Sequence, residues 1–451
     1  MSAYRIRGGR PLRGTVPISG AKNSVLPILA ATLLNGGRSV LHNCPHLRDV
    51  ESAIRILRHL GCTVSWEGDT VTVDSSRVSR WDVPHDLMRE MRSSVIFLGP
   101  ILARCGRARL SLPGGCEIGQ RPIDLHLAAL RRLGVTIRES GGDILCQAGD
   151  LRGRDVILGF PSVGATENAL LTAVACPGVT RIINAAREPE IADLQNFLQK
   201  AGAQVTGGGE SILTVSGEMP RRDVEHTILP DRIETATFLC AAAACGGEIT
   251  LTDTEPEHVG TVLQYLGEGG CVTRISGRSI TLRAPQRLGR FSTVRTMPYP
   301  GFPTDAQAPL MAAACTARGD TLMIETIFEN RFRHVPELGR MGADIRIDGR
   351  TALVRGGELF GARVCCTDLR GGAALVIAAL AARGESTVDN IVHIQRGYER
   401  LEEKLRALGA DIALAPEEET GMQKGAAAWL TNGKKPSAAA ADAAAAAHRR
   451  P

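Results

Sequence analysis

The sequence predicts an α/β protein made of two compact domains, each built from three copies of one unit of about 70 residues. Three observations lead to this fold class: a helix–turn–strand pattern that recurs six times, a second pattern with the same period, and a total length of 451 residues. The length alone favours two or three domains of ordinary size.

The first pattern is a helix-like stretch that ends at a glycine turn and continues as an extended stretch. Its glycines recur at intervals of 67–73 residues. A glycine at this place is typical of a helix C-terminus, because it adopts the left-handed conformation without strain. The copies read LRHLGCTV, LRRLGVTI, LQKAGAQV, YLGEGGCV, GRMGADI and LRALGADI, with turn glycines at Gly61, Gly134, Gly202, Gly269, Gly342 and Gly409.

The second pattern is an alanine-rich helix, a glycine and a short strand, as in ACPGVTRIIN and ACGGEITLTD. Together the two patterns give each unit two helices and about four strands. Units of this size exceed the repeats of about 20–50 residues that build solenoids. They therefore suit two compact domains of three units each.

The domain boundaries follow from where the units begin. We place the first domain at residues 22–228 and the second at residues 1–21 plus 229–416, with the N-terminal strand returning to the second domain. Residues 417–451 are alanine-rich and low in complexity, so we expect a disordered tail. A ligand site between the two domains is the default expectation.

Composition excludes several classes of protein. Twelve cysteines without paired spacing or a secretory signal favour a reducing cytoplasm over a disulfide framework. Metal-binding spacings and apolar runs of membrane-spanning length are absent, so we expect no metal and no membrane insertion. Most of the net charge of +5 lies in the tail, which leaves no basic surface for nucleic acid. The oligomeric state stays open.

Three residues stand out by their local sequence. Cys116 lies in the glycine-rich stretch SLPGGCEIGQRP, five residues before Arg121. The residues alone leave two interpretations open, a small buried hydrophobe or a thiol whose pKa the guanidinium lowers. Lys22 in SGAKN fits two interpretations, a solvated residue beside an ordinary helix cap or a cation at an anion site. Asp305 in FPTDAQ is, from these residues alone, best explained as a cap after a Pro-Thr turn.

Ten segments, in this order, carry a resemblance to a known family: ISGAKNSVLPIL, MRSSVIFLGP, LPGGCEIGQRPIDLH, FPSVGATEN, NAAREPEI, LPDRIETATF, FPTDAQAP, ETIFENRFRHVPEL, TDLRGGAALV and HIQRGYERLEEKLRALGA. They resemble the UDP-N-acetylglucosamine 1-carboxyvinyltransferases, which are enolpyruvyl transferases, over about residues 4–415. The resemblance implies two inside-out α/β barrels of three units each, which agrees with the repeats.

The resemblance also implies a reaction. The enolpyruvyl group of phosphoenolpyruvate moves to the 3′-hydroxyl of UDP-N-acetylglucosamine, and phosphate is released. This is the first committed step of peptidoglycan precursor synthesis, so it serves cell-wall biogenesis, cell shape and cell division. No cofactor is implied, and the thiol of Cys116 is expected to make the protein sensitive to the epoxide fosfomycin.

Individual roles follow from the same resemblance. Cys116 is implied to donate a proton and to form a covalent adduct with phosphoenolpyruvate, Asp305 to take the proton of the sugar hydroxyl, and Lys22 to assist. The residues implied to bind phosphoenolpyruvate are Lys22, Asn23, Arg121, Arg331, Arg370 and Arg396. Those implied to bind UDP-N-acetylglucosamine are Arg92, Arg121, Pro122, Ile123, Asp124, Leu125, Pro161, Ser162, Val163, Gly164, Asp305 and Ile327.

Other residues are expected to act indirectly. His126 is expected to pack behind the site. Arg48 stands where the family often has lysine. Gly371 and Gly372, after TDLR, replace bulkier residues of some members, and we expect them to loosen the loop there. Three acidic residues are expected to hold arginines in place: Glu188, Asp49 and Asp368.

Three alternatives are set against this interpretation. The sister enzyme that acts on shikimate 3-phosphate lacks the loop cysteine and the SVGATEN segment, and both are present here. A sensor that binds the nucleotide sugar without turnover would be favoured by loss of Cys116, Lys22 or Asp305, and all three are present. A scaffold that acts through its basic tail would lose function on truncation after about Ala415, whereas we expect truncation to leave activity intact.

Overall fold

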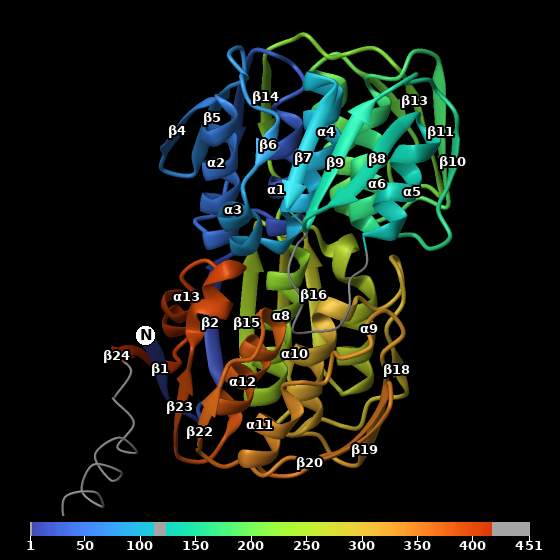
Figure 1. The fold of residues 1–451 in the computed structure, drawn as a ribbon. Helices are drawn as coiled ribbons and strands as arrows, with labels where there is room; N and C mark the ends of the chain where they lie inside the picture. The colour runs from blue at the N-terminus through green and yellow to red at the C-terminus, as the bar shows by residue number, and fades with distance from the viewer. Residues whose placement is uncertain (1, 112–122, 417–451) are drawn as a thin grey trace, which may run out of the picture. The chain divides into compact units, whose positions relative to one another are not determined.

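The computed structural model describes residues 2–111 and 123–416 of the chain (Figure 1). Residues 1–415 form one compact unit. The segment with Cys116, Arg121 and Pro122 lies outside the described residues, as does the predicted tail, 417–451.

Within the described residues, the strands form six four-stranded sheets, as many as the predicted units. In the first half of the chain their orders are β14–β3–β5–β4, β6–β7–β9–β8 and β10–β11–β13–β12. These strands are β3 (Arg38–His42), β4 (Thr63–Glu67), β5 (Thr70–Asp74), β6 (Asp82–Val83), β7 (Arg107–Ser111), β8 (Val135–Ser140), β9 (Asp143–Ala148), β10 (Asp155–Ile157), β11 (Val179–Ile183), β12 (Gln204–Thr206), β13 (Ile212–Ser216) and β14 (Val224–Thr227).

The other three sheets have the orders β16–β17–β15–β2, β18–β19–β21–β20 and β22–β23–β1–β24. Their strands are β1 (Ser2–Arg7), β2 (Leu12–Pro17), β15 (Gly247–Thr252), β16 (Val272–Ser276), β17 (Ser279–Ala284), β18 (Val294–Arg295), β19 (Asp320–Ile324), β20 (Asp344–Asp348), β21 (Thr351–Arg355), β22 (Arg363–Cys365), β23 (Glu385–Asp389) and β24 (Asp411–Pro416). The N-terminal strands β1 and β2 thus complete sheets of the second half.

One pairing scheme recurs in the sheets. A first strand runs parallel to a second, and the remaining pairs are antiparallel, as in β10–β11–β13–β12 and in β18–β19–β21–β20. In two of the sheets the parallel partner is distant in the sequence. Strand β14 pairs with β3, and β2 pairs with β15. The predicted α/β fold of repeated units is confirmed.

Six helices are buried on nearly every side. Alanine dominates several of them, as in TDAQAPLMAAA, and its small side chain lets neighbouring helices approach closely. A helix that is apolar all round belongs in a core, and the three from the second half contact one another. These inner helices are α1 (Lys22–Ala31), α4 (Leu98–Cys105), α6 (Val163–Ala173), α8 (Arg232–Cys245), α10 (Thr304–Ala314) and α12 (Leu369–Ala381).

A second set of helices is amphipathic. Helix α2 buries Val50, Ile54 and Leu57 and exposes its charged residues except Asp49, as the spacing of its apolar residues predicts. The set comprises α2 (Arg48–Leu60), α5 (Asp124–Arg132), α7 (Pro189–Lys200), α9 (Gly260–Glu268), α11 (Val335–Arg340) and α13 (Leu401–Ala407). Short helices complete the described residues: α3 (His85–Glu90), η1 (Arg92–Phe97), η2 (Pro256–Val259) and η3 (Ile391–Arg396).

The predicted turn glycines follow this second set. Gly61 ends α2 in the left-handed conformation, with φ of 104°. The prediction for Gly269 is wrong in detail, because its φ is −70° and the next residue, Gly270, adopts the left-handed conformation instead.

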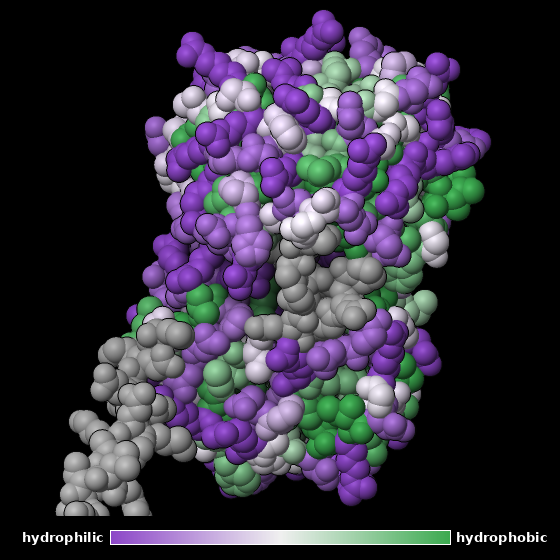
Figure 2. Space-filling model, viewed as in Figure 1, coloured by the Kyte–Doolittle hydropathy of each residue, from purple (hydrophilic) through white to green (hydrophobic). Residues whose placement is uncertain are grey.

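Buried hydrophobic residues form two clusters. One takes its members from residues 25–228, and the other from residues 4–18 and 236–412. Polar side chains cover much of the face shown in Figure 2, with smaller apolar patches between them. The division into domains at residues 21 and 228 stays a prediction, since the compact unit spans both halves. No helix among the described residues is long and apolar enough to cross a membrane.

Two glycines, each directly after a strand, test the packing of the chain against the turns that follow the inner helices α6 and α10. A Cβ atom at Gly217 would lie 1.6 Å from the carbonyl oxygen of Cys176, and one at Gly356 would lie 1.9 Å from that of Ala317. Because backbone must move to make room, we expect Gly217→Ala and Gly356→Ala each to lower the free energy of unfolding by about 2 kcal/mol or more. Urea unfolding measures this.

The matched control is Gly267→Ala in α9, where an added Cβ meets no atom within 4 Å. We expect this variant to lose no stability, since alanine is the better helix former. Equal stability of all three variants would contradict the packing described.

Candidate active site

The predicted site residues gather at the N-terminal ends of inner helices. Lys22 is the first residue of α1, Asp305 the second of α10 and Arg370 the second of α12. Helix N-termini present unpaired N–H groups and a partial positive charge, so they favour anions. The repeated units therefore place the predicted site residues at helix ends that favour anions.

Asp231 joins two of these helix ends. Its Oδ1 caps α8 by accepting hydrogen bonds from the main-chain N–H groups of Ile233 at 2.7 Å and Glu234 at 3.0 Å. Its Oδ2 accepts a hydrogen bond from the main-chain N–H of Lys22 at 3.2 Å. One buried carboxylate thus fixes the start of α1 against the start of α8. Asn23 follows Lys22 and is half-buried.

A first charge cluster centres on Asp49. Its carboxylate oxygens lie 2.7 Å from Nζ of Lys22 and 2.9 Å from Nε of Arg396, and Nη2 of Arg396 donates a further hydrogen bond at 3.3 Å. The side chain of Asp49 is only 2% exposed. The structure thus brings together Lys22 and Arg396, which the resemblance implies bind phosphoenolpyruvate, and Asp49, which is expected to hold arginines, contacts both.

The pKa values of this cluster reflect burial and charge. Burial alone would raise the pKa of Asp49, but Lys22 and Arg396 outweigh it, and the pKa lies below its ordinary value. Burial lowers the pKa of Lys22, Asp49 opposes this, and the guanidinium groups of Arg396 and Arg370 lower it further. Arg370 therefore acts electrostatically on this cluster as well as on the next.

A second charge cluster centres on Asp305. Its Oδ1 accepts a hydrogen bond from Nη2 of Arg331 at 2.8 Å, and its Oδ2 accepts one from Nη2 of Arg370 at 3.2 Å. The two arginine side chains are 3% exposed, whereas that of Asp305 is 27% exposed. Two buried cations thus hold a carboxylate that solvent, or a substrate, reaches.

The two arginines have hydrogen-bond donors that no described residue accepts. Nε of Arg331 and both Nε and Nη1 of Arg370 are buried without a partner among the described residues. A buried unpaired donor is costly and calls for an explanation. Donors on planar guanidinium groups match the oxygens of a carboxylate or phosphate.

The predicted nucleotide-sugar segments lie at the starts of α5 and α6. Ser162 is the N-cap of α6, where its hydroxyl accepts a hydrogen bond from the main-chain N–H of Ala165 at 3.4 Å. The remaining residues of this group lie beside these helix starts or begin them: Ile123, Asp124, Leu125, Pro161, Val163 and Gly164. Arg92 begins η1.

His126 packs behind this group. A Cβ at Gly164 would lie 2.8 Å from the imidazole of His126. Nδ1 of His126 is hydrogen-bonded to the side-chain amide of Asn168 at 2.8 Å, and burial lowers the pKa of His126 to about 4. His126 is therefore a neutral packing residue.

Two expectations about the start of α12 need correction. Asp368 accepts hydrogen bonds from the main-chain N–H groups of Arg370 and Gly371, both at 3.0 Å, so it caps the helix rather than holding the guanidinium. Gly371 and Gly372 lie in the first turn of α12 and are buried. The expectation that they loosen a loop is wrong.

Buried acidic residues lie around Arg232, and the sequence did not predict them. Nε of Arg232 lies 2.9 Å from Glu190, so α7 and α8 are joined by a buried ion pair. Burial, then Glu190 and Glu188, raise the pKa of Glu167 well above its usual range. Arg232 was visible only as part of the LPDRIETATF segment, and no spacing signal points to Glu167.

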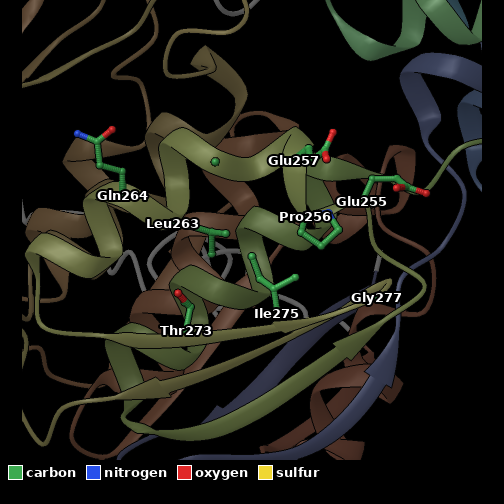
Figure 3. A pocket seen from close by; sticks show the side chains of 9 residues that line it. Glu255, Pro256, Glu257, Leu263, Gln264, Thr273, Ile275 and Gly277 are labelled. Carbon is green, nitrogen blue, oxygen red and sulfur yellow. The ribbon is translucent and has the colours of Figure 1, made fainter.

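A separate hollow lies on the surface beside η2, α9 and β16, and its volume is about 720 Å³ (Figure 3). No predicted site residue lines it. The residues that do are Glu255, Pro256, Glu257, Gly260, Leu263, Gln264, Thr273, Ile275 and Gly277. The candidate site is therefore defined by the charge clusters and not by this hollow.

The comparisons with known proteins first give the class. The family model described as EPSP synthase (3-phosphoshikimate 1-carboxyvinyltransferase) matches residues 6–405. The structure of the enolpyruvyl transferase NikO from Streptomyces tendae has a TM-score of 0.83 and 28% identity, and the match covers 92% of this chain and 99% of that one. An EPSP synthase structure from Acinetobacter baumannii shares the fold, with a TM-score of 0.69, 17% identity, and coverage of 92% and 100%. The family match and the shared fold thus place the chain among the enolpyruvyl transferases.

Curated relatives narrow the class. UDP-N-acetylglucosamine 1-carboxyvinyltransferase 2 of Caldanaerobacter subterraneus subsp. tengcongensis is 49% identical over 413 residues, which is 91% of this chain and 99% of the relative. UDP-N-acetylglucosamine 1-carboxyvinyltransferase 1 of Symbiobacterium thermophilum is 51% identical over 417 residues, with coverage of 91% and 94%. The chain belongs to the UDP-N-acetylglucosamine 1-carboxyvinyltransferase family.

The raised pKa of Glu167 gives a pH-dependent prediction. A carboxyl whose pKa is higher in the folded than in the unfolded protein stabilises the fold below its unfolded value of about 4.3, and this stability is lost as the pH rises through the folded pKa. Glutamine copies the protonated acid. We therefore expect Glu167→Gln to raise the melting temperature by several degrees at pH 8, and by less toward pH 4.5.

Thermal unfolding of both proteins across this pH range measures the difference. Glu190→Gln is the control, and we expect it to lower the melting temperature because Arg232 loses its buried partner. A Glu167→Gln effect that is the same at every pH would contradict a protonated Glu167.

Proposed function

We propose that the protein transfers the enolpyruvyl group of phosphoenolpyruvate to the 3′-hydroxyl of UDP-N-acetylglucosamine and releases phosphate. One observation carries the choice of chemistry: Asp305 is held between two buried arginines that keep unpaired N–H donors. The choice of acceptor is supported by the relatives described above, which are named for this activity.

The donor is an anion at two ends, a carboxylate and a phosphate. The buried donors of Arg331 and Arg370 suit its carboxylate, because a planar guanidinium meets two oxygens at once. Lys22, with Asn23 beside it at the start of α1, and Arg396 suit the phosphate. Arg121 is proposed as a further phosphate contact from the resemblance and lies outside the described residues.

The acceptor hydroxyl must lose a proton as its oxygen attacks C2 of the enolpyruvyl group. Asp305 suits this role, since Arg331 and Arg370 hold its carboxylate in place and its side chain is partly exposed. Cys116 is proposed to give a proton to C3, and it lies outside the described residues. C3 then gives up a proton as the C2–C3 double bond re-forms and the bond between C2 and the phosphate oxygen breaks, so that phosphate leaves and carries away one proton.

This addition and elimination needs no redox partner, because no net electron transfer takes place. We propose that it runs without a cofactor. The eleven cysteines in the described part of the chain form no disulfide bond, which supports a reducing, cytoplasmic location. The product would be committed to peptidoglycan precursors.

Phosphate release tests the proposal directly. The protein is incubated with phosphoenolpyruvate and either UDP-N-acetylglucosamine or shikimate 3-phosphate, and inorganic phosphate is measured. We expect release with the nucleotide sugar alone.

Release of phosphate with shikimate 3-phosphate alone would show that the protein instead transfers the enolpyruvyl group to shikimate 3-phosphate. Release with neither, together with measurable binding of the nucleotide sugar, would favour a sensor. Asp305→Asn serves as the matched control, and we expect it to slow release by about 10²–10⁴-fold.

A further inference from the structure

Glu325, directly after β19, has a carboxylate that is buried and fully engaged. Glu325 is 1% exposed. Its Oε1 accepts hydrogen bonds from the main-chain N–H groups of Ile327 at 2.8 Å and Phe328 at 3.1 Å, and from the hydroxyl of Thr296 at 3.0 Å. Its Oε2 accepts one from the hydroxyl of Thr304 at 2.9 Å. Four donors from three stretches of chain thus converge on one side chain.

Two of these stretches belong to the candidate site. Ile327 is a predicted contact of the nucleotide sugar, and Thr304 begins α10 immediately before Asp305, the proposed base. The carbonyl oxygen of Thr304 also accepts a hydrogen bond from Nη2 of Arg331 at 3.4 Å. Glu325 therefore holds the main chain on the acceptor side and the start of the helix that carries the base.

The geometry leaves each stretch little freedom of its own. Because both N–H groups of the turn bind the same oxygen, the turn at Ile327 and Phe328 is fixed to Oε1. Because Oε2 receives the hydroxyl of Thr304, α10 begins at a set position relative to that turn. A shift of about 1 Å between a substrate group and its catalytic partner is enough to cost about 10²-fold in rate.

We propose that Glu325 is a positioning residue that fixes Asp305 relative to the main chain at Ile327, and so sets where the acceptor hydroxyl meets its base. This inference rests on the proposed function. Glu325 does not touch the reacting atoms. It acts through Thr304 on the base and through the turn on the acceptor.

Two variants separate the contact of Glu325 with Thr304 from its contacts with the turn at Ile327. Glu325→Gln replaces one carboxylate oxygen with an NH2 group, which donates but cannot accept a hydrogen bond, so the variant loses the contact with Thr304 or the contacts with the turn at Ile327. Thr304→Val removes only the hydroxyl that ties α10 to Glu325. The matched control is Thr321→Val in β19, a buried threonine whose hydroxyl accepts a hydrogen bond from Phe291 N–H at 3.4 Å, remote from Asp305 in its contacts.

Steady-state phosphate release, with each substrate varied in turn, measures the effects. For Glu325→Gln we expect the KM of UDP-N-acetylglucosamine to rise and kcat to fall, each about tenfold or more, while the KM of phosphoenolpyruvate stays within about twofold. For Thr304→Val we expect kcat to fall about tenfold with little change in either KM. Thr321→Val is expected to match the wild type.

If the role of Glu325 were purely structural, Glu325→Gln would lower the melting temperature without changing the KM of one substrate and not the other. Thr304→Val would then not lower kcat while leaving both KM values unchanged. Kinetic constants of Glu325→Gln within twofold of the control would overturn the inference. Should Glu325→Gln fail to fold, an unchanged kcat for Thr304→Val would overturn it instead. Wild-type protein that shows no turnover with UDP-N-acetylglucosamine would overturn the proposed function, and this inference with it.

Discussion

The site depends on the pairing of buried cations with two carboxylates. Lys22 and Arg396 share Asp49, and Arg331 and Arg370 share Asp305. Buried charges are tolerated only when they are paired and hydrogen-bonded, so these acids keep in place the cations that we propose bind the anionic substrate. Three buried N–H groups on Arg331 and Arg370 have no hydrogen-bond partner among the described residues, so the carboxylate of Asp305 does not use every donor of these arginines.

The repeated fold supplies the geometry for this pairing. Inner helices are packed by small side chains, and their N-terminal ends carry the charged groups. Asp231 ties the starts of α1 and α8 together, and Glu325 ties the start of α10 to the turn after β19. Rigid helix ends suit a reaction in which small displacements change the rate.

The sequence predicted the repeats and the fold class because glycine turns and alanine-rich helices leave a strong local signal. It also pointed to Lys22, Asp305 and the arginines, since they lie in segments that resemble a family. It could not predict the partners, because Glu325, Glu167 and Asp231 act through contacts between distant parts of the chain. Burial decides their roles, and a short motif does not encode burial. The error at Gly371 has the same origin, because the sequence does not show that this residue is buried in the first turn of α12.

The binding of phosphoenolpyruvate to an Arg370→Lys variant tests the central claim most directly, because lysine keeps the charge but lacks the planar donors. Isothermal titration calorimetry gives the dissociation constant. The pairing described predicts affinity at least about tenfold weaker than in the wild type, or about 1.4 kcal/mol. Arg350→Lys, at an exposed arginine paired with Glu329, is predicted to leave it unchanged. Affinity of Arg370→Lys within twofold of the wild type would contradict the account.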